Sequence, residues 1–389
     1  MSGLAYKQVM NKKILILGGG IAGLTTAIAL QRKNIDFTVY EAVPEIKAIG
    51  SGISLAGNAM KVLEQLQVAE QVKARGHVIT SMIIQDEKGN YISALDTRKF
   101  TREYGMYNVA IHRSALHEVL LGEIPPGRIQ TGKKAIGFNE KENSVVLKFD
   151  DGTEAEGTSV IVADGIHSAI RKQLLPDSTP RYAGYTCWRG IVENTWGIED
   201  QAVEAWGTTG RIGYVPIGDN KVYWFACKNA PYQDEHMKQL SREALRKNFE
   251  SFSQPVPQII EQTPIENIIW NDIVDLKPIS RFAFKRILLI GDAAHATTPN
   301  LGQGACLGIE DALAIGELLE HQENPVKAFE VFEQTRLKRA HFIVNTSYRV
   351  GKVAQVENRF LVRLRNALFR LLPESINERQ LKQVLDITS

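Results

Sequence analysis

Apolar and polar residues follow a strand–helix–strand pattern at the start of the chain. An apolar stretch at Lys13–Gly18 precedes a helical pattern at Ile21–Asn34 and a second apolar stretch at Phe37–Glu41. This order predicts a βαβ unit, whose usual outcome is a parallel sheet. Two later apolar stretches, Ser159–Ala163 and Arg286–Gly291, are predicted to join that sheet.

The segments between these stretches alternate with the period of two that is typical of half-buried strands. Met82–Leu95 alternates around a DEKGN turn, and Lys134–Glu156 forms a meander with turns at NEKEN and DDG. Aromatic-rich strands cover Tyr182–Ala226 and include a hairpin with arms Arg211–Ile217 and Lys221–Lys228. These segments predict an antiparallel β-sheet domain that interrupts the α/β domain.

The last third of the chain is predicted to be mostly helical. A helical stretch at Glu235–Ser251 and a last strand at Ile265–Leu276 come first, and the pattern after Gly304 is helical almost to the end. The predicted fold class is therefore α/β, with interleaved domains and helices that close the C-terminus.

Composition narrows the functional classes. A length of 389 residues suggests two to three domains, and a net charge of +2 is too small to argue for nucleic acid or an anionic membrane surface. The histidines show no metal-binding spacing, so no metal site is predicted. The cysteines form neither a disulfide framework nor a CxxC pair, which suits a reducing cytoplasm; they are Cys187, Cys227 and Cys306.

The uncharged run Ile14–Leu30 resembles the apolar part of a signal peptide. It is short for a membrane span, and three consecutive glycines interrupt it. We therefore predict a cytoplasmic protein without a membrane span.

A glycine motif follows the first predicted strand and opens the first helix. Gly18 permits a tight turn, Gly20 lets a pyrophosphate approach the backbone, and Gly23 lets helix and strand pack closely. The helix N-terminus offers N–H groups to the phosphates, and Glu41, at the end of the next strand, can accept hydrogen bonds from a ribose. The motif predicts dinucleotide binding, but FAD and NAD share it.

A second strand–turn–helix stretch, LLIGDAAHATTPNLGQGA at Leu288–Ala305, distinguishes the two. Asp292 ends its strand, where an acid can bind a hydroxyl-rich chain such as ribityl. The helix that follows could direct N–H groups at a flavin ring and stabilise negative charge on its reduced form. FAD is long enough to contact Gly20 with one half and Asp292 with the other, so we predict FAD.

The stretches GGGIAGL…YE, VADGIHSAIR and GDAAHATTPNLGQGA resemble the three signatures of the single-component aromatic-hydroxylase family of FAD-dependent monooxygenases. GSGISLAGNAMKVLEQL and HRSALHEVL fit the same family in order and spacing, so the resemblance covers nearly the whole chain. YAGYTCWRGIVE is similar to the first substrate-domain strand of the urate-hydroxylase, salicylate-hydroxylase and zeaxanthin-epoxidase branch. Trp188 and Arg189 depart from the urate-hydroxylase pattern, which makes urate itself a doubtful substrate.

This resemblance implies a Rossmann-like FAD-binding domain, an interleaved antiparallel β-sheet substrate domain and C-terminal helices. The expected boundaries are 1–80, 111–180 and 281–350 for the FAD-binding domain, 81–110 and 181–280 for the substrate domain, and 351–389 for the helical end.

The resemblance also implies cofactor contacts. The residues expected at the AMP half are Ala22, Glu41, Ala42 and, near the adenine, Ala135. Those expected at the ribityl and flavin half are Ser54, Arg113, Asp292, Gly302, Gln303, Gly304 and Ala305. In the family, Asp164 with Gly165 helps to place both FAD and the reduced nicotinamide; the residues alone are equally typical of a strand-ending turn.

Arg211 and Tyr223 are the candidate catalytic residues, because the family branch directs residues at these positions at the substrate. Arg211 could hold an anionic or carbonyl-bearing ring and Tyr223 could orient it; alternatively, Tyr223 is a core aromatic and Arg211 a surface charge. Arg211 shares a strand face with Gly213, Val215 and Ile217, so it needs either a buried acid or a bound anion as partner.

Other polar residues carry weaker indications. His295 follows GDAA, and a structural or cofactor-facing role is favoured over a catalytic one. Cys306 is expected to be a small residue packed behind the flavin loop. Arg336, Lys338 and Arg339 are expected to form the solvated face of a C-terminal helix.

The predicted activity is that of an NAD(P)H-dependent monooxygenase for a small aromatic or heteroaromatic compound. In the family, O2 adds to reduced FAD at C4a, and the hydroperoxide transfers one oxygen atom in a hydroxylation or epoxidation. We expect a monomer or weak homodimer.

Three alternatives remain open. A tetracycline-inactivating monooxygenase would share every FAD motif. A flavin reductase or dehydrogenase would form no hydroperoxide, which stopped-flow spectroscopy detects. A non-enzymatic carrier of the Rab-escort type would lack GDAAH…GQG and purify colourless.

Overall fold

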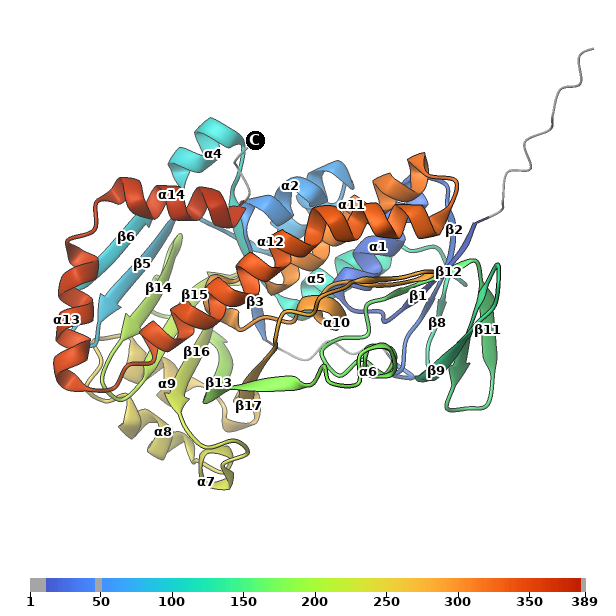
Figure 1. Ribbon diagram of the computed structural model, residues 1–389. Coiled ribbons are helices and arrows are strands. Elements are labelled where there is room, and N and C mark those ends of the chain that lie inside the picture. Colours follow the sequence, from blue (N-terminus) through green and yellow to red (C-terminus); the bar gives the residue numbers. More distant parts are fainter. Residues whose placement is uncertain (1–11, 46–50, 386–389) are drawn as a thin grey trace, which may run out of the picture.

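The computed structural model describes residues 12–45 and 51–385. Gly50 of the GSGIS motif and the ends of the predicted first and last domain segments lie outside the described residues. The described chain is built around two large sheets, with long helices across one side (Figure 1).

The first large sheet has six strands in the order β18-β19-β12-β1-β2-β8. Its four central strands are parallel, and β18 is antiparallel to β19. The two later apolar stretches therefore join the sheet of the βαβ unit, as predicted. Its strands are β1 (Lys13–Leu17), β2 (Asp36–Tyr40), β8 (Ile129–Gln130), β12 (Ser159–Val162), β18 (Ala283–Phe284) and β19 (Ile287–Leu289).

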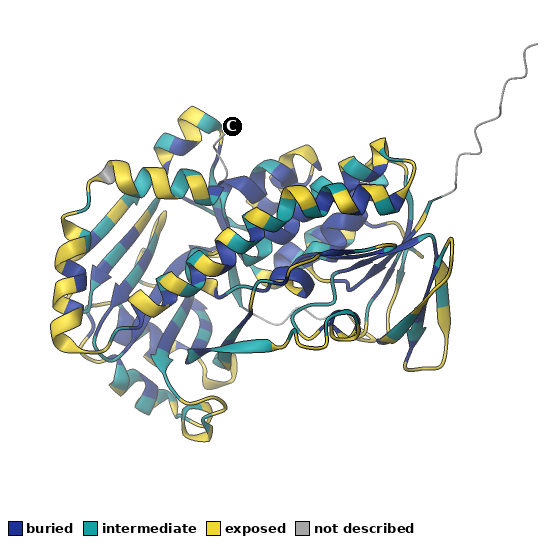
Figure 2. Ribbon diagram, viewed as in Figure 1, coloured by how far each residue is buried: buried dark blue, intermediate teal, exposed yellow. Residues whose placement is uncertain are grey.

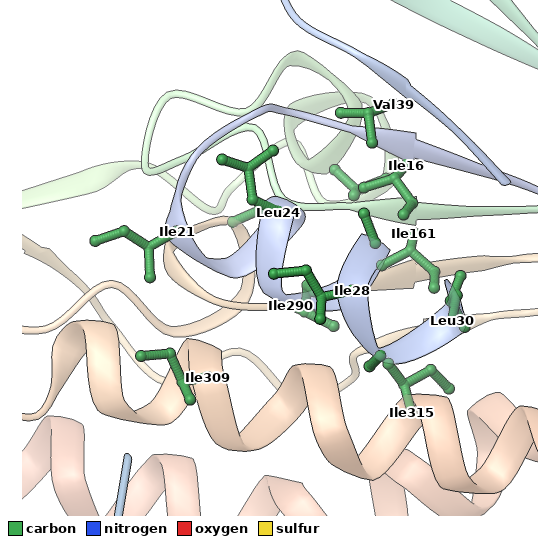
Figure 3. Packing of buried hydrophobic residues seen from close by; sticks show 14 of the residues in the cluster. Ile16, Ile21, Leu24, Ile28, Leu30, Val39, Ile161, Ile290, Ile309 and Ile315 are labelled. Carbon is green, nitrogen blue, oxygen red and sulfur yellow. The ribbon is translucent and has the colours of Figure 1, made fainter. Parts of the chain in front are cut away.

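Helix α1 (Ile21–Arg32) packs between this sheet and α11 (Gly304–His321), so nearly all of its faces are buried. Ile28 of α1, Ile161 of β12 and Ile315 of α11 belong to the same close-packed core (Figure 3). Because the sheet and α11 both exclude water, α1 has no polar stripe. This core holds the carboxyl ends of β1 and β19 in fixed positions.

The second large sheet has seven strands, in the order β17-β13-β16-β15-β14-β5-β6. All neighbours are antiparallel except β14 and β5. The hairpin formed by β15 and β16 is the one predicted. The strands are β5 (Ser81–Asp86), β6 (Tyr91–Asp96), β13 (Pro180–Glu193), β14 (Gln201–Trp206), β15 (Arg211–Ile217), β16 (Lys221–Asn229) and β17 (Ile269–Leu276).

Two short sheets complete the β-structure. The predicted meander is β9 (Ala135–Glu140), β10 (Val145–Phe149) and β11 (Glu154–Gly157). The other sheet, which joins the two large ones, is β3 (Gly52–Leu55), β7 (Asn108–His112) and β4 (His77–Ile79).

One face of the seven-stranded sheet carries a second core around Trp188 and Trp224, covered by α8 and α9. The helical stretch predicted at Glu235–Ser251 is divided into α7 (Glu235–Lys238) and α8 (Arg242–Asn248), because the Ser241 side chain caps a new helix start. The last strand begins four residues later than predicted, after a 3-10 turn at Ile265–Asn267.

The C-terminal part is helical, as predicted, and α12 runs diagonally across both large sheets (Figure 1). No helix in residues 12–45 and 51–385 is long and apolar enough to cross a membrane. The remaining helices are α2 (Gly57–Gln65), α3 (Ala69–Arg75), α4 (Arg98–Tyr104), α5 (Arg113–Gly122), α6 (Ala169–Leu174), α9 (Val256–Gln262), α10 (Asp292–His295), α12 (Pro325–Ala354), α13 (Arg359–Arg370) and α14 (Glu374–Leu385), with a 3-10 turn, η2, at Pro299–Leu301.

Candidate functional site

A cavity of about 370 Å³ lies between the carboxyl ends of β1 and β19 and one face of the seven-stranded sheet. It brings together most of the predicted flavin and substrate residues: Gly20, Ala22, Ser54, Arg113, Arg211, Tyr223, Asp292, Gly302, Gly304 and Ala305. Another hollow, near α8, is more open to solvent and contains none of the predicted residues. The first cavity is therefore the candidate site.

The three motif glycines have different surroundings. A Cβ on Gly23 would lie 1.9 Å from the carbonyl oxygen of Gly18, and one on Gly18, at φ +105°, would lie 2.4 Å from that of Ala163. A Cβ on Gly20 would meet no protein atom within 4 Å, because Gly20 borders the cavity. Gly18 and Gly23 thus permit close packing, while Gly20 leaves space for a ligand.

Glu41 lies beyond the Gly20 end of the cavity and is not part of its wall. Its Oε2 accepts the Gly19 N–H at 2.6 Å, and its Oε1 accepts the Val43 N–H at 3.0 Å. A carboxylate has further lone pairs for hydroxyl donors. Ala42 and the buried Ala135 are also outside the cavity wall, so the predicted AMP contacts remain predictions.

Asp164 follows β12 and has an unsatisfied buried acceptor. Its Oδ1 is buried with no hydrogen-bond partner, and burial raises the pKa of its carboxyl to about 6. An orphaned carboxylate oxygen of this kind is costly unless a donor reaches it. A sugar hydroxyl of a bound dinucleotide would be such a donor. Asp164 itself does not line the cavity, although its neighbours Ala163 and Gly165 do.

The turn that presents Asp292 to the cavity is held from behind by Asp311. Oδ2 of Asp311 accepts the Gly291 N–H at 3.1 Å and lies 2.6 Å from Nε2 of His295. Asp292 itself is exposed toward the cavity. His295 is buried in this contact, which agrees with the first of the two roles expected for it, structural or cofactor-facing.

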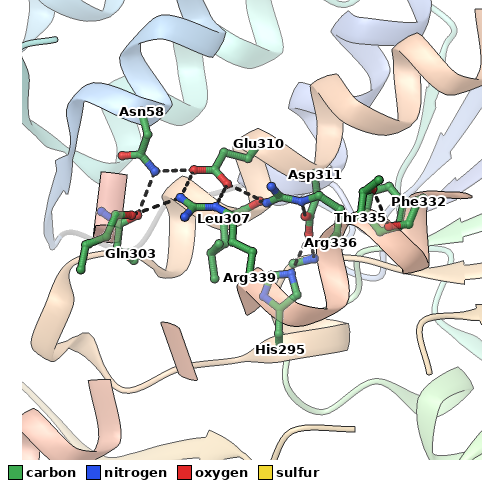
Figure 4. A network of polar contacts seen from close by, with 12 residues as sticks. Asn58, His295, Gln303, Leu307, Glu310, Asp311, Phe332, Thr335, Arg336 and Arg339 are labelled. Atoms are coloured by element: carbon green, nitrogen blue, oxygen red, sulfur yellow. Dashed lines mark hydrogen bonds and ion pairs between the residues drawn. The ribbon is translucent and has the colours of Figure 1, made fainter. Parts of the chain in front are cut away.

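The acids of α11 also bind two arginines of α12 (Figure 4). Arg336 contacts Asp311 at 2.8 Å and Glu310 at 2.7 Å, and Arg339 contacts Glu310. The side chains of Arg336 and Arg339 are only 11% and 9% exposed, so the prediction of a solvated face was wrong for both. Lys338 is exposed, as predicted.

Gln303 belongs to the same network and not to the cavity wall. Its Oε1 accepts a hydrogen bond from Nδ2 of Asn58 at 2.9 Å, on the α2 side of the loop (Figure 4). Cys306 is buried one turn later, and its sulfur accepts the Ala56 N–H at 3.4 Å. Both residues support the loop that carries Gly302 and Gly304.

Arg211 has a protein acid as its partner. It is buried, and its guanidinium donates to Oε1 of Glu204 at 2.7 Å, to Oε1 of Gln355 at 3.1 Å and to Oδ1 of Asn300. The sequence left open either an acidic residue or a bound anion as the partner of Arg211, and the structure has an acidic residue, Glu204, in that role. Arg211 still borders the cavity, so its role toward substrate stays a prediction.

Tyr223 lies on the same sheet face, opposite Val215. Within the described residues its hydroxyl has no hydrogen-bond partner, and burial raises its pKa, so it remains a donor. The ring packs against Gly52 of β3, where a Cβ would lie 2.2 Å from a ring carbon. Gly52 therefore lets the flavin-side strand touch the substrate-side sheet.

Arg189 lines the cavity but is not one of the two predicted catalytic residues. It lies on β13 opposite Phe225, on the face shared with Tyr223. Its guanidinium makes a 3.5 Å contact with Oδ1 of Asn271 and also interacts with the thiol of Cys187. Alternation along β13 groups Arg189 with Cys187, but the pairing of β13 with β16 cannot be read from either strand alone.

The chain matches the family described as FAD binding domain over residues 11–347. It is 36% identical to the aurachin C monooxygenase/isomerase of Stigmatella aurantiaca, over 96% of this chain and 98% of that protein. The chain belongs to the FAD-dependent aromatic-hydroxylase-type monooxygenases.

Two further similarities agree with this family. The 2-heptyl-3-hydroxy-4(1H)-quinolone synthase of Pseudomonas aeruginosa is 31% identical over 94% of this chain and 96% of its own length. The structure of Klebsiella pneumoniae HpxO with FAD and uric acid superimposes with a TM-score of 0.89, at 28% identity, and 96% of each chain is covered. The predicted family, fold class and FAD cofactor are thereby confirmed, and the protein is an oxidoreductase.

Proposed function

We propose that this monooxygenase hydroxylates or epoxidises a small aromatic or heteroaromatic compound with NAD(P)H and O2. The overall reaction consumes one NAD(P)H, one proton and one O2, places one oxygen atom in the substrate and releases the other as water. The observation that carries the proposal is the cavity between the glycine-motif end of the first sheet and the Arg189–Tyr223 face of the second.

The residues present fit FAD in three respects. Gly20 leaves open space at the helix N-terminus, Asp164 has an orphaned acceptor, and Asp292 is exposed at the other end of the cavity. We propose that Gly20 and Ala22 lie along the pyrophosphate, and that Asp292 and the Gly302–Ala305 loop hold ribityl and flavin. When bound, FAD supplies the reduction by NAD(P)H and the activation of O2.

The protein's own contribution at the substrate end is orientation and exclusion of water. We propose that the Arg189 guanidinium binds a carbonyl or ionised oxygen of the substrate, because it lines the cavity and has no carboxylate partner in the described chain. The protonated Tyr223 hydroxyl would donate a second hydrogen bond and fix the ring. Phe225 would stack on an aromatic substrate.

The experiment is a screen for compounds that stimulate NAD(P)H oxidation and yield an oxygenated product by mass spectrometry. The 31% identical relative is named for a hydroxylated 4-quinolone, so 2-alkyl-4-quinolones are tested first, followed by urate, aromatic acids and tetracycline. Oxidation that yields only hydrogen peroxide or no product with every compound would instead favour a reductase.

Tyr223→Phe is expected to lower the amount of product formed per NAD(P)H and to raise hydrogen peroxide release. When the substrate ring is poorly oriented, O2 is reduced to hydrogen peroxide without transfer of oxygen to the substrate. Loss of one neutral hydrogen bond corresponds to about one decade in kcat/KM. Tyr214→Phe, on the opposite face of the adjacent strand, is the matched control. Equal coupling in both variants would exclude Tyr223 from substrate contact.

FAD affinity is expected to fall as the pH is lowered through about 6. An ionised Asp164 is the better acceptor for a sugar hydroxyl, and its carboxyl protonates at that pH. The folding stability of the apoprotein has the opposite pH dependence. Because the pKa of Asp164 is raised in the folded state, the free energy of unfolding falls as the pH rises from about 4 to 6. Titrating apoprotein with FAD by flavin fluorescence measures the effect, and Asp164→Asn should flatten the pH dependence; an unchanged slope removes Asp164 from the site.

Two glycine variants separate ligand space from packing. Gly20→Ala is expected to raise the FAD dissociation constant by about one decade with little change in thermal stability, because its methyl group would project into the cavity. Gly23→Ala should lower both the thermal stability and the affinity for FAD, since its Cβ would overlap the Gly18 carbonyl. Thermal midpoints of the apoproteins and FAD titrations report the two quantities; equal destabilisation by both variants would contradict the assignment.

A further inference from the structure

Helix α13 lies at the edge of the molecule, and much of it is exposed (Figures 1 and 2). Its exposed surface carries a stripe of large apolar side chains. At 100° per residue, the stripe falls within an arc of about 100° of the helix surface. Isolated exposed apolar side chains are common, but a continuous stripe of large ones marks an interaction surface. Its residues, with their exposed fractions, are Phe360 (72%), Leu361 (49%), Leu364 (47%), Leu368 (55%) and Leu371 (79%).

The opposite face holds α13 firmly on the protein. Arg365 is buried, donates to the carbonyl oxygens of Val353 and Ala354 at 3.1 and 3.0 Å, and lies 4.7 Å from the Trp206 ring. Phe369 packs edge-on against the same tryptophan at 5.6 Å. The stripe therefore points outward because the other face is anchored.

The charge on α13 has one sign. Its sequence, RFLVRLRNALFR, contains four arginines and no acid. Arg365 is buried and Arg370 binds Asp86 at 2.8 Å. Arg359 and Arg363 are exposed, have no ion pair in the described chain, and lie along one edge of the stripe. An apolar stripe edged by arginines is typical of a helix that lies in a membrane interface.

We propose that α13 binds the surface of a membrane that contains anionic lipids, with its leucines and Phe360 in the acyl boundary and Arg359 and Arg363 at the headgroups. A second copy of the chain is the less favourable occupant, because a twofold contact through this stripe would bring the same arginines of both copies together. None of the stripe residues lines the cavity, and the proposal does not depend on the proposed reaction.

The test is co-sedimentation of the full-length holoenzyme with vesicles. The wild type should pellet with vesicles of phosphatidylcholine and phosphatidylglycerol, less with phosphatidylcholine alone, and less as salt is raised. Leu364→Glu with Leu368→Glu should abolish pelleting. Arg359→Gln and Arg363→Gln should each weaken it by roughly fivefold, as expected for one basic residue near an anionic surface.

Ile136→Glu is the matched control, since Ile136 is equally exposed but lies on β9. It should pellet like the wild type, and all variants should retain FAD absorbance as evidence of folding. Pelleting that survives the double leucine variant would overturn the proposal. A wild-type protein that stays in the supernatant would also overturn it. If light scattering then shows a dimer that the double leucine variant dissociates, the stripe binds a second copy of the chain and not a membrane.

Discussion

Asp311→Asn is expected to lower the free energy of unfolding by about 3 kcal/mol, because it removes one of the two carboxylates that neutralise the buried Arg336 and the carboxylate that contacts His295. Asp311 is 1% exposed and contacts Arg336, His295 and the Gly291 N–H. Burial alone would raise the pKa of its carboxyl, but His295 and Arg336 lower it well below the ordinary value. The stabilisation is thus present at neutral pH and is lost only in strong acid.

The same substitution should also weaken FAD binding, because Asp311 holds the turn from which Asp292 reaches the cavity. Urea unfolding and FAD titration of the variant measure the two effects. Asp275→Asn is the control: Asp275 is also buried and bound to an arginine, Arg181, but is not part of the cavity wall. It should lose stability and keep FAD affinity. Weaker FAD binding in both variants would show a general effect of destabilisation.

The FAD half of the candidate site could be predicted because each of its parts is local. A strand, a turn and a helix start within a dozen residues determine where Gly20 and Asp292 lie, and parallel strands of one sheet bring their carboxyl ends to one edge. The structure has that edge and that cavity. Hydrophobic patterning alone was enough to recognise the strands of both large sheets except the two-residue strands β8 and β18.

The substrate half could not be predicted to the same degree, because its face is assembled from three strands. Arg189 on β13 is separated by more than thirty residues from Tyr223, and only the pairing of β13 with β16 places them together. The ion-pair partner of Arg211 could not be predicted either, because this acid, Glu204, lies on β14. The prediction that Arg336 is solvated was wrong for the same reason, since its acidic partners lie on another helix.

Net charge was also a weak guide to local surfaces. The chain sums to +2, yet α13 alone carries four arginines and no acid. The net charge of the chain hides the local positive charge of one helix. The spacing of the leucines and arginines in the sequence of α13 reveals it. The membrane proposal depends on that spacing and not on the total charge.

Arg189→Met is expected to raise the KM of an oxygen-bearing aromatic substrate by 10- to 100-fold with little change in stability. Removal of a charge-assisted hydrogen bond typically costs about 1.5–3 kcal/mol, which corresponds to this range. Arg189→Lys should recover part of the loss. Arg189 has no carboxylate partner in the described chain, so its removal leaves no buried carboxylate unpaired and takes away only the contacts with Asn271 and the Cys187 thiol.

Arg211→Met should behave in the opposite way, since Arg211 and Glu204 neutralise each other beside the cavity. Its removal leaves the Glu204 carboxylate, 25% exposed, without its cation, and we expect a loss of about 3 kcal/mol in unfolding free energy. Thermal midpoints and KM values of both variants decide between the roles. If Arg211→Met instead raises KM in a stable protein, Arg211 binds substrate directly, as its position in the family suggests, and Glu204 serves to hold it ready for the ligand.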